Sequence, residues 1–365
     1  MTLGISIYPE KTTFERDKEY IDLAYGYGYR RIFTSLLELS GDADQVITNF
    51  KKTVQYANAI GMEVMVDINP QIFSQLGISY DDLAFFADLG AFGVRLDVGF
   101  TGREEAEMTR NPYGIKIEVN MSIGTSYIDN ILSFSPNRKN LLGSHNFYPM
   151  EYSGLSEDFY KKCCKQFKNY SLETAAFITS KHAAMGPWPL QDGLCTLEIH
   201  RKQSIRSQAQ YFSLDDMLDT IIIGDAYASE NELEEVANAY YSTHPTLQIV
   251  FEEYTLPIEK KIVLEEVHGY RGDTSEYLMR SSLPRFKYKE ETIPMTNCPA
   301  LKKGDIVIGN DHFGQYKGEM HIVLADVSNE KQRCNLVGHL TDESIKLLPS
   351  VKPWSKFKII EKGGV

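Results

Sequence analysis

The chain has 365 residues, of which 42% are hydrophobic and 12% aromatic, so it can bury a substantial core. Single domains seldom exceed about 250–300 residues, and the length therefore predicts two domains. The formal net charge of −12 argues against a nucleic-acid or membrane-surface partner, although local arginines can still bind an anionic small molecule.

The start of the chain carries no recognisable targeting segment. Met1 leads almost directly into an apolar β-like run, and no apolar run in the chain approaches the ~18 residues that a membrane span needs. The five cysteines form no Cys-x-x-Cys motif, which favours reduced thiols over a zinc knuckle or a redox pair. We therefore expect a cytoplasmic protein.

Residues 1–243 alternate between apolar β-like runs and helical stretches, a pattern typical of a parallel sheet. Eight strands are predicted, at residues 4–9, 30–34, 62–70, 93–99, 115–120, 140–149, 174–179 and 219–226. Helices are predicted at residues 14–27, 42–60, 81–88, 101–106, 126–133, 156–170 and 229–241. Eight strands suit a closed (β/α)8 barrel, and a doubly wound sheet is the alternative.

The pattern changes after residue 243. Short strand-like runs follow, punctuated by Gly and Pro, and no long helix is expected. The runs lie at residues 247–253, 261–268, 285–290, 305–310 and 319–326. Residues 244–365 therefore predict a small all-β barrel, joined to a catalytic barrel formed by residues 1–243.

Three carboxylates fall at the ends of consecutive predicted strands, namely Asp67, Asp97 and Glu118. The carboxyl ends of barrel strands meet at one mouth, so these groups should face a common site. There they can act as general acid, general base or nucleophile, or can instead fix a polar network inside the barrel. Arg95, two residues before Asp97, is expected to hold a carboxylate.

Neutral donors and acceptors are expected around the same mouth, as a sugar site would require. The candidates are Tyr8, Asn69, Asn120, His145, Asn146 and Tyr148. Each could instead make an ordinary strand-end hydrogen bond. Carboxylates together with His145 could also ligate a divalent metal. No His-x-His motif appears, and we expect neither a metal nor another cofactor.

A phosphate site is predicted in the long connection between the seventh and eighth strands, where barrels often bind phosphate. His200 and Arg201 lie there, and Glu198 just before them could be a fourth active-site acid. A charge cluster of this kind can also be a solvated surface. In the second domain, Arg280 and the residues from Asn310 to Glu319 are expected to contribute to substrate binding.

Several motifs resemble those of one family, the bacterial 6-phospho-N-acetylmuramidases. They are Gly-Ile-Ser-Ile-Tyr-Pro (4–9), Arg-Leu-Asp-Val-Gly-Phe (95–100), Asn-Phe-Tyr-Pro (146–149), Thr-Leu-Glu-Ile-His-Arg (196–201), Ile-Gly-Asp-Ala (223–226) and Tyr-Lys-Gly-Glu (316–319). The resemblance spans nearly the whole chain. It implies a TIM barrel followed by a cyclophilin-like β-barrel, and hydrolysis of N-acetylmuramic acid 6-phosphate–N-acetylglucosamine during cell-wall recycling. Residues 268–273, His-Gly-Tyr-Arg-Gly-Asp, depart from the His-x-Asn-Arg-x-Asp form expected of the family.

The sequence thus predicts a glycoside hydrolase for a phosphorylated amino-sugar disaccharide. Asp97 is the first candidate for a catalytic carboxylate and Glu198 the second, with Asp67 and Glu118 in support. Retaining, inverting and substrate-assisted mechanisms all stay open. So do two other functions, a metal-dependent sugar-phosphate isomerase or epimerase and a non-catalytic phosphosugar-binding protein. The oligomeric state is also open, with a homodimer as one option.

Overall fold

The computed structural model describes residues 1–36, 43–68, 73, 78–183, 185–190 and 192–363. The chain divides into two compact units, Met1–Tyr240 and Tyr241–Val365. Within the described residues, no helix combines the length and the apolar character needed to cross a membrane.

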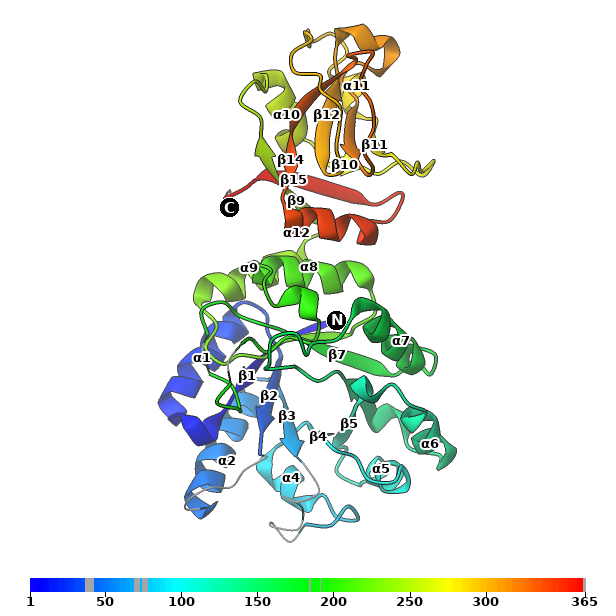
Figure 1. Ribbon diagram of the computed structural model, residues 1–365. Helices are drawn as coiled ribbons and strands as arrows, with labels where there is room; N and C mark the ends of the chain where they lie inside the picture. Colours follow the sequence, from blue (N-terminus) through cyan, green and yellow to red (C-terminus); the bar gives the residue numbers. More distant parts are fainter. Residues whose placement is uncertain (37–42, 69–72, 74–77, 184, 191, 364–365) are drawn as a thin grey trace. The chain divides into compact units, whose positions relative to one another are not determined.

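The first unit is a closed barrel of eight parallel strands that pair in sequence order. The strands are β1 (Thr2–Ile7), β2 (Arg31–Ser35), β3 (Glu63–Ile68), β4 (Gly93–Leu96), β5 (Lys116–Asn120), β6 (Leu141–Ser144), β7 (Glu173–Ile178) and β8 (Thr220–Ile223). Helices lie outside this barrel (Figure 1). They are α1 (Phe14–Gly26), α2 (Ala43–Ala59), α4 (Ala84–Leu89), α5 (Arg103–Met108), α6 (Tyr127–Ser133), α7 (Glu157–Lys168), α8 (Ile205–Asp215) and α9 (Glu230–Tyr241). The predicted (β/α)8 barrel is confirmed.

Local sequence signals set the ends of these helices. The Ser156 hydroxyl accepts a hydrogen bond from the Phe159 amide at 3.4 Å, and two acidic residues follow in the first turn of α7. Thr13 caps α1 in the same way, through the Arg16 amide. Helix α4 ends at Gly90, whose φ of 86° is a left-handed conformation that glycine adopts without strain.

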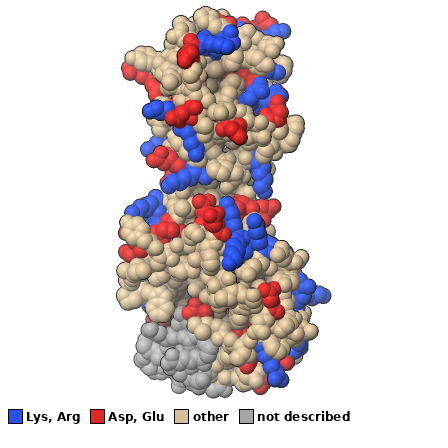
Figure 2. Space-filling view, turned by 45° about the vertical axis from the view of Figure 1, so that its right-hand side comes forward, with Lys and Arg blue, Asp and Glu red and all other residues tan. Residues whose placement is uncertain are grey.

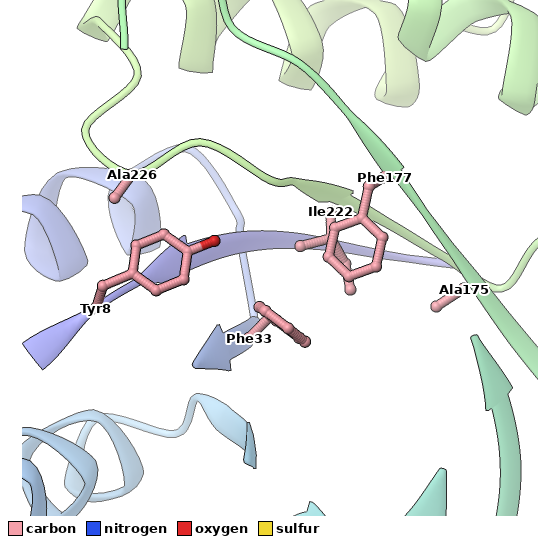
Figure 3. Packing of buried hydrophobic residues seen from close by; sticks show 6 residues of the cluster. All are labelled: Tyr8, Phe33, Ala175, Phe177, Ile222 and Ala226. Carbon is pink, nitrogen blue, oxygen red and sulfur yellow. The ribbon is translucent and has the colours of Figure 1, made fainter. Parts of the chain in front are cut away.

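The interior of the barrel has an apolar side, built by β1, β2, β7 and β8. Figure 3 shows its cluster of buried side chains, which consists of Tyr8, Phe33, Ala175, Phe177, Ile222 and Ala226. The rings of Phe33 and Phe177 meet edge to face, with centroids 5.1 Å apart. Because β2 and β7 are not neighbours in the sheet, this contact must cross the inside of the barrel.

The opposite side of the interior is charged. In the parallel register, Asp67 of β3 pairs with Arg95 of β4, and Arg95 pairs with Glu118 of β5. Residues in register on adjacent strands point to the same face, so these three side chains form one row inside the barrel. Buried charges are tolerated in such a row because opposite charges alternate along it.

The second unit contains a seven-stranded sheet in the order β10-β15-β9-β14-β12-β13-β11. The strands are β9 (Thr246–Phe251), β10 (His268–Gly269), β11 (Leu278–Ser281), β12 (Asp305–Gly309), β13 (Met320–Val323), β14 (Cys334–Leu340) and β15 (Lys356–Glu361). Its two edges approach each other, since the Arg271 amide donates to the Arg280 carbonyl at 3.1 Å. The sheet therefore nearly closes, which confirms a second, mostly β barrel.

Two strands predicted in this unit are wrong, because both segments are helical. Residues 261–268 fall largely in α10 (Pro257–Glu265), and residues 285–290 begin in α11 (Pro284–Lys287). Each helix starts with a proline, whose fixed φ suits the first helical position. In α10 the Glu259 carboxylate also accepts from the Leu256 amide at 2.9 Å, which closes the first turn.

Strands β14 and β15 and the helix α12 (Asp342–Leu347) were not predicted. Strand β14 is buried along almost its whole length and includes polar Asn335 and His339 with Gly338 between them. A strand covered on both faces does not alternate between apolar and polar residues. The two-residue period that identifies a strand is therefore not visible in its sequence.

Acidic and basic side chains are interspersed over both units on the face shown in Figure 2. That face presents no broad positive field among the residues drawn in colour. This distribution agrees with the net negative charge of the chain and gives nucleic acid no extended basic surface there.

Candidate active site

A cavity of about 200 Å³ opens at the carboxyl ends of the barrel strands. Its lining comes from β3, β4, the segment after β6 and the connection between β7 and β8, and consists of Asp67, Arg95, Asp97, Asn146, Phe147 and Trp188. Enzymes with this fold place their chemistry at this end of the barrel. The cavity is therefore the candidate active site.

Arg95 links most of the polar groups in this cavity. Its Nη1 lies 2.6 Å from Asp67 Oδ1 and 3.5 Å from Asp97 Oδ1. Nε donates to the Ser144 hydroxyl at 2.8 Å, and Nη2 donates to the side-chain oxygen of Asn146. With only 3% of its side chain exposed, the guanidinium is a fixed support that orients both aspartates.

The two aspartates differ in environment. Asp67 is buried, and burial raises its pKa to about 7 although the Arg95 guanidinium acts in the opposite direction. Asp97 has 36% of its side chain exposed to solvent. A pair of carboxyls in unlike surroundings is the arrangement from which enzymes obtain separate acid and base roles.

Glu118 is the third member of the charged row and lies next to Arg95. Its oxygens are 3.9 Å from Arg95 Nε and 3.8 Å from Arg31 Nη1, and its side chain is 2% exposed. It does not line the cavity. In this position Glu118 balances the charge of the two buried arginines.

The two asparagines predicted at the mouth have different places, and a third candidate is not described. Asn146 lines the cavity, and its side-chain oxygen accepts from Arg95, so its amide nitrogen can donate to a ligand; no described residue is seen to accept from that nitrogen. Asn120 instead braces the backbone, because it donates to the Asp97 carbonyl at 3.4 Å and accepts from the Ser122 amide at 2.9 Å. Asn69 lies outside the described residues.

His145 faces the helical layer and not the cavity. Its Nδ1 is 3.0 Å from the Ser122 hydroxyl and its Nε2 is 3.4 Å from the thiol of Cys164 on α7. Burial, aided by the charge of Arg95, lowers the pKa of His145 to about 3. We had expected His145 to line the mouth of the barrel. Neighbouring residues in an extended segment point to opposite sides, and because Asn146 points into the cavity, His145 points outward.

The two tyrosines are also occupied away from the cavity. The Tyr8 hydroxyl donates to the Gly224 carbonyl at 2.7 Å, and its ring belongs to the apolar side of the barrel. Tyr148 forms a short β-bridge with Cys195, and burial raises the pKa of its hydroxyl. Neither residue lines the cavity.

The geometry of residues 198–201 does not favour the predicted phosphate site. Arg201 binds both oxygens of Glu198 at 2.8 Å and donates to the carbonyls of Asp192 and Gly193. His200 is fully buried between aromatic rings, and burial lowers its pKa to about 3. Arg201 is therefore already paired, and His200 is buried and uncharged.

The same contacts change the expectation for Glu198. Its carboxylate also accepts from the amides of Tyr152 and Gly154, at 2.9 and 2.8 Å. The hydrogen bonds from Arg201 and these amides lower the pKa of Glu198 to about 2. A carboxylate so fully bonded is a clamp between two loops, and it does not line the cavity.

Arg280, the remaining candidate, belongs to the second unit. Its Nη2 lies 2.6 Å from Glu319 Oε1, and Arg285 reaches the other oxygen of that carboxylate at 2.8 Å. Glu319 has no solvent-exposed side-chain surface. Arg280 thus has a structural partner, while 25% of its side chain stays exposed.

Trp188 was missed from the sequence, since it lies in a loop without periodicity. The available signal is Gly-Pro-Trp-Pro at residues 186–189, where two prolines restrict the loop that presents the ring. Lys11 holds this loop, because its Nζ donates to the carbonyls of Gly186 and Pro187 at 2.8 and 2.6 Å. The described residues include no group of three His, Cys, Asp or Glu side chains that could hold a metal ion.

Two family models match the chain, one to each unit. The model for the 6-phospho-N-acetylmuramidase N-terminal region matches residues 3–238, and the model for the C-terminal region matches residues 245–360. The chain belongs to the 6-phospho-N-acetylmuramidase family. The family's name is that of a glycosidase, which agrees with the two carboxyls of the cavity.

Two solved structures are similar to this chain over nearly its whole length. An uncharacterized B. cereus protein is 43% identical, with a TM-score of 0.88 over 99% of both chains. A conserved protein of unknown function from a locus in Enterococcus faecalis is 25% identical, with a TM-score of 0.78 over 100% of this chain and 97% of that one. None of the curated proteins compared with the chain matches it.

Proposed function

We propose that this member of the 6-phospho-N-acetylmuramidase family is a cytoplasmic glycoside hydrolase that cleaves N-acetylmuramic acid 6-phosphate–N-acetylglucosamine in peptidoglycan recycling. The observation that supports this most is the pair Asp67 and Asp97, fixed by one guanidinium in a cavity at the barrel mouth. The family match supplies the substrate class.

In the proposed reaction Asp67 is the general acid. A carboxyl with a pKa of about 7 retains its proton in a useful fraction of molecules near neutral pH, and can give it to the leaving glycosidic oxygen. As the glycosidic C–O bond breaks, Asp97, more exposed and within reach of Arg95, attacks the anomeric carbon or orients the acetamido group that does so. A water molecule that loses its proton to the Asp67 carboxylate then displaces that group from the anomeric carbon and completes the hydrolysis.

The spacing of the two carboxyls favours retention of configuration. One nitrogen, Arg95 Nη1, contacts both aspartates, so their Oδ1 atoms are separated by no more than the sum of 2.6 and 3.5 Å. Inverting enzymes usually need ~6.5–9.5 Å between carboxyls, and retaining ones ~5–5.5 Å. This limit on the Oδ1 atoms lies below the separation typical of inverting enzymes, and it therefore supports a retaining mechanism.

The aromatic lining supports a sugar as substrate. Phe147 and Trp188 contribute ring surface to the cavity, and Asn146 contributes an amide donor. Sugar rings present apolar C–H faces as well as hydroxyls, so they suit a site that combines aromatic surface with a few placed polar groups.

The direct test is to incubate the purified protein with the phosphorylated disaccharide and to follow the products by NMR. We expect release of N-acetylglucosamine, and the first-formed anomer of the muramic acid 6-phosphate should have the configuration of the substrate. Inversion would contradict the roles of Asp67 and Asp97. Conversion of a sugar phosphate only in the presence of a divalent ion, without glycosidic cleavage, would favour the isomerase alternative.

A further inference from the structure

The second unit contains a cavity of its own, of about 320 Å³, which the proposed hydrolysis does not use. Its wall is mostly apolar and comes from β11, β12 and the loops around them, including Leu278, Leu301, Val307, Phe313 and Val327. These residues belong to the hydrophobic core of the unit, so the cavity reaches into the core itself. Small-molecule sites in proteins are typically concave, largely apolar and of ~300–1,000 Å³.

One polar atom of a buried residue is available inside this cavity. His321, on β13, is 4% exposed and lines the cavity. Its Nε2 lies 3.2 Å from Glu319 Oε1, and a carboxylate can only accept, so Nε2 carries the proton. The other ring nitrogen, Nδ1, has no partner within the described residues and is left to make a hydrogen bond with a ligand.

The histidine is held in this orientation from behind. Arg280 and Arg285 both bind Glu319, which is itself fully buried. Although burial raises the pKa of Glu319, the hydrogen bonds from His321 and Arg280 outweigh it and lower that pKa. The carboxylate therefore stays charged, and the ring is fixed with Nδ1 away from it.

The rim of the cavity is positively charged. Lys331 and Arg333 line it, both are exposed, and neither side chain has a partner within the described part of the chain. Glu330 contributes one negative charge against these two positive ones. In a chain of net charge −12, two free cations at the mouth of an apolar cavity favour an anionic occupant.

We propose that the second unit binds a small organic anion in this cavity. The apolar body of the ligand lies against Leu278 and Phe313, a polar group of the ligand forms a hydrogen bond with His321 Nδ1, and its acid group pairs with Lys331 and Arg333. No residue that lines this cavity lines the candidate active site, and binding here needs no turnover to be observed.

The probe for the test is 8-anilino-1-naphthalenesulfonate, which has an apolar body, one N–H donor and one anionic group. We expect saturable binding of one molecule per chain, followed by fluorescence and by calorimetry on the full-length protein. Raising the salt concentration should weaken it, because the rim charges are exposed. On binding, the ¹⁵N resonance of His321 Nδ1 should move in the direction expected of a new hydrogen bond.

Three variants make the test specific. Leu278→Trp should fill the cavity and abolish binding, and the double variant Lys331→Glu/Arg333→Glu should weaken it at least tenfold. Lys289→Glu/Lys346→Glu is the matched control, since both lysines are exposed in the same unit and neither lines the cavity. Several weak sites per chain, or affinity that Leu278→Trp leaves unchanged, would overturn the proposal. If the charge-reversed variant fails to fold, the salt dependence of the wild type decides instead. A wild-type affinity for the probe that does not change with salt concentration would overturn the proposal.

Discussion

At the scale of single residues, one arginine holds two carboxylates whose surroundings differ. Arg95 touches both Asp67 and Asp97, but one acid is buried and the other is partly exposed. Strand alternation was enough to predict that these three side chains lie close together, because it places them on one face at the ends of adjacent strands. Trp188 and the outward turn of His145 were not foreseen, since the first depends on a loop and the second required the end of β6 to be known.

Replacing Asp97 tests the proposed nucleophile or orienting group. Asp97→Asn should keep the fold and lower kcat by roughly 10²–10⁴-fold, the range typical of positioned acid–base groups. Steady-state kinetics on the phosphorylated disaccharide measures this. Asp88→Asn is the control, because Asp88 is exposed on α4 and does not line the cavity. A folded Asp97→Asn protein with near wild-type turnover would remove Asp97 from the mechanism.

The raised pKa of Asp67 predicts how kcat/KM falls at alkaline pH. A general acid must be protonated, and the Asp67 carboxyl loses its proton as the pH rises through its raised pKa of about 7. The value of kcat/KM should therefore fall above pH about 7. Asp67→Asn should be slow at every pH and should lack this limb. A limb that persists unchanged in the variant would assign it to another group.

At the scale of elements, the loops after the strands are fixed by hydrogen bonds between charged side chains and the backbone of other loops. Glu198 and Arg201 join the segment at 152–154 to the turn at 192–193, and Lys11 joins the segment after β1 to the loop of Trp188. In the first unit the strands and most helices, though not α8 (Ile205–Asp215), followed from periodicity and caps, but these long-range clamps did not. Hydrogen bonds from a side chain to the backbone of a distant loop leave no periodic trace, and the charges at 198–201 were equally compatible with a ligand site.

The Glu198 clamp predicts a pH dependence of stability. Glu198 has a folded-state pKa of about 2, below its ordinary value of 4.5, so it stabilises the fold above pH about 4.5. That contribution is lost as the pH falls from about 4.5 to about 2. Denaturant titrations in this window should show a steeper loss of unfolding free energy for the wild type than for Glu198→Gln. Identical slopes would mean that the clamp is not formed in solution.

At the scale of the whole molecule, the chain consists of two units with separate cores. The first was predicted nearly strand by strand, because parallel strands and their covering helices alternate regularly. In the second, three predicted strands match β9, β12 and β13, while two others fell on proline-initiated helices whose apolar residues resemble β-runs. Long, regular helices and strands can be predicted from a single sequence. The conformation of short segments depends on the residues that pack against them, so it cannot.

Weakening the core of the second unit tests how far the two units are independent. Leu336→Ala removes a buried side chain of β14 and should cost about 2–5 kcal/mol, the usual range for such a truncation. Calorimetry should show one lowered transition and one unchanged transition. At 25 °C kcat should be unaffected, because the proposed chemistry lies in the first unit, while KM can rise. A matching loss of kcat would place a catalytic group in the second unit.

The divided interior of the barrel has a consequence for how such proteins can diverge. The groups that would carry the reaction come from β3 to β5, whereas the side chains that shape the opposite wall come from β1, β2, β7 and β8. Changes at Phe33 or Phe177 can alter the volume of the barrel interior without touching Arg95 or either aspartate. Phe33 and Phe177 do not line the cavity themselves, but both pack against Phe147, which does. The shape of the cavity and the proposed catalytic groups thus depend on different strands, so one can change while the other is kept.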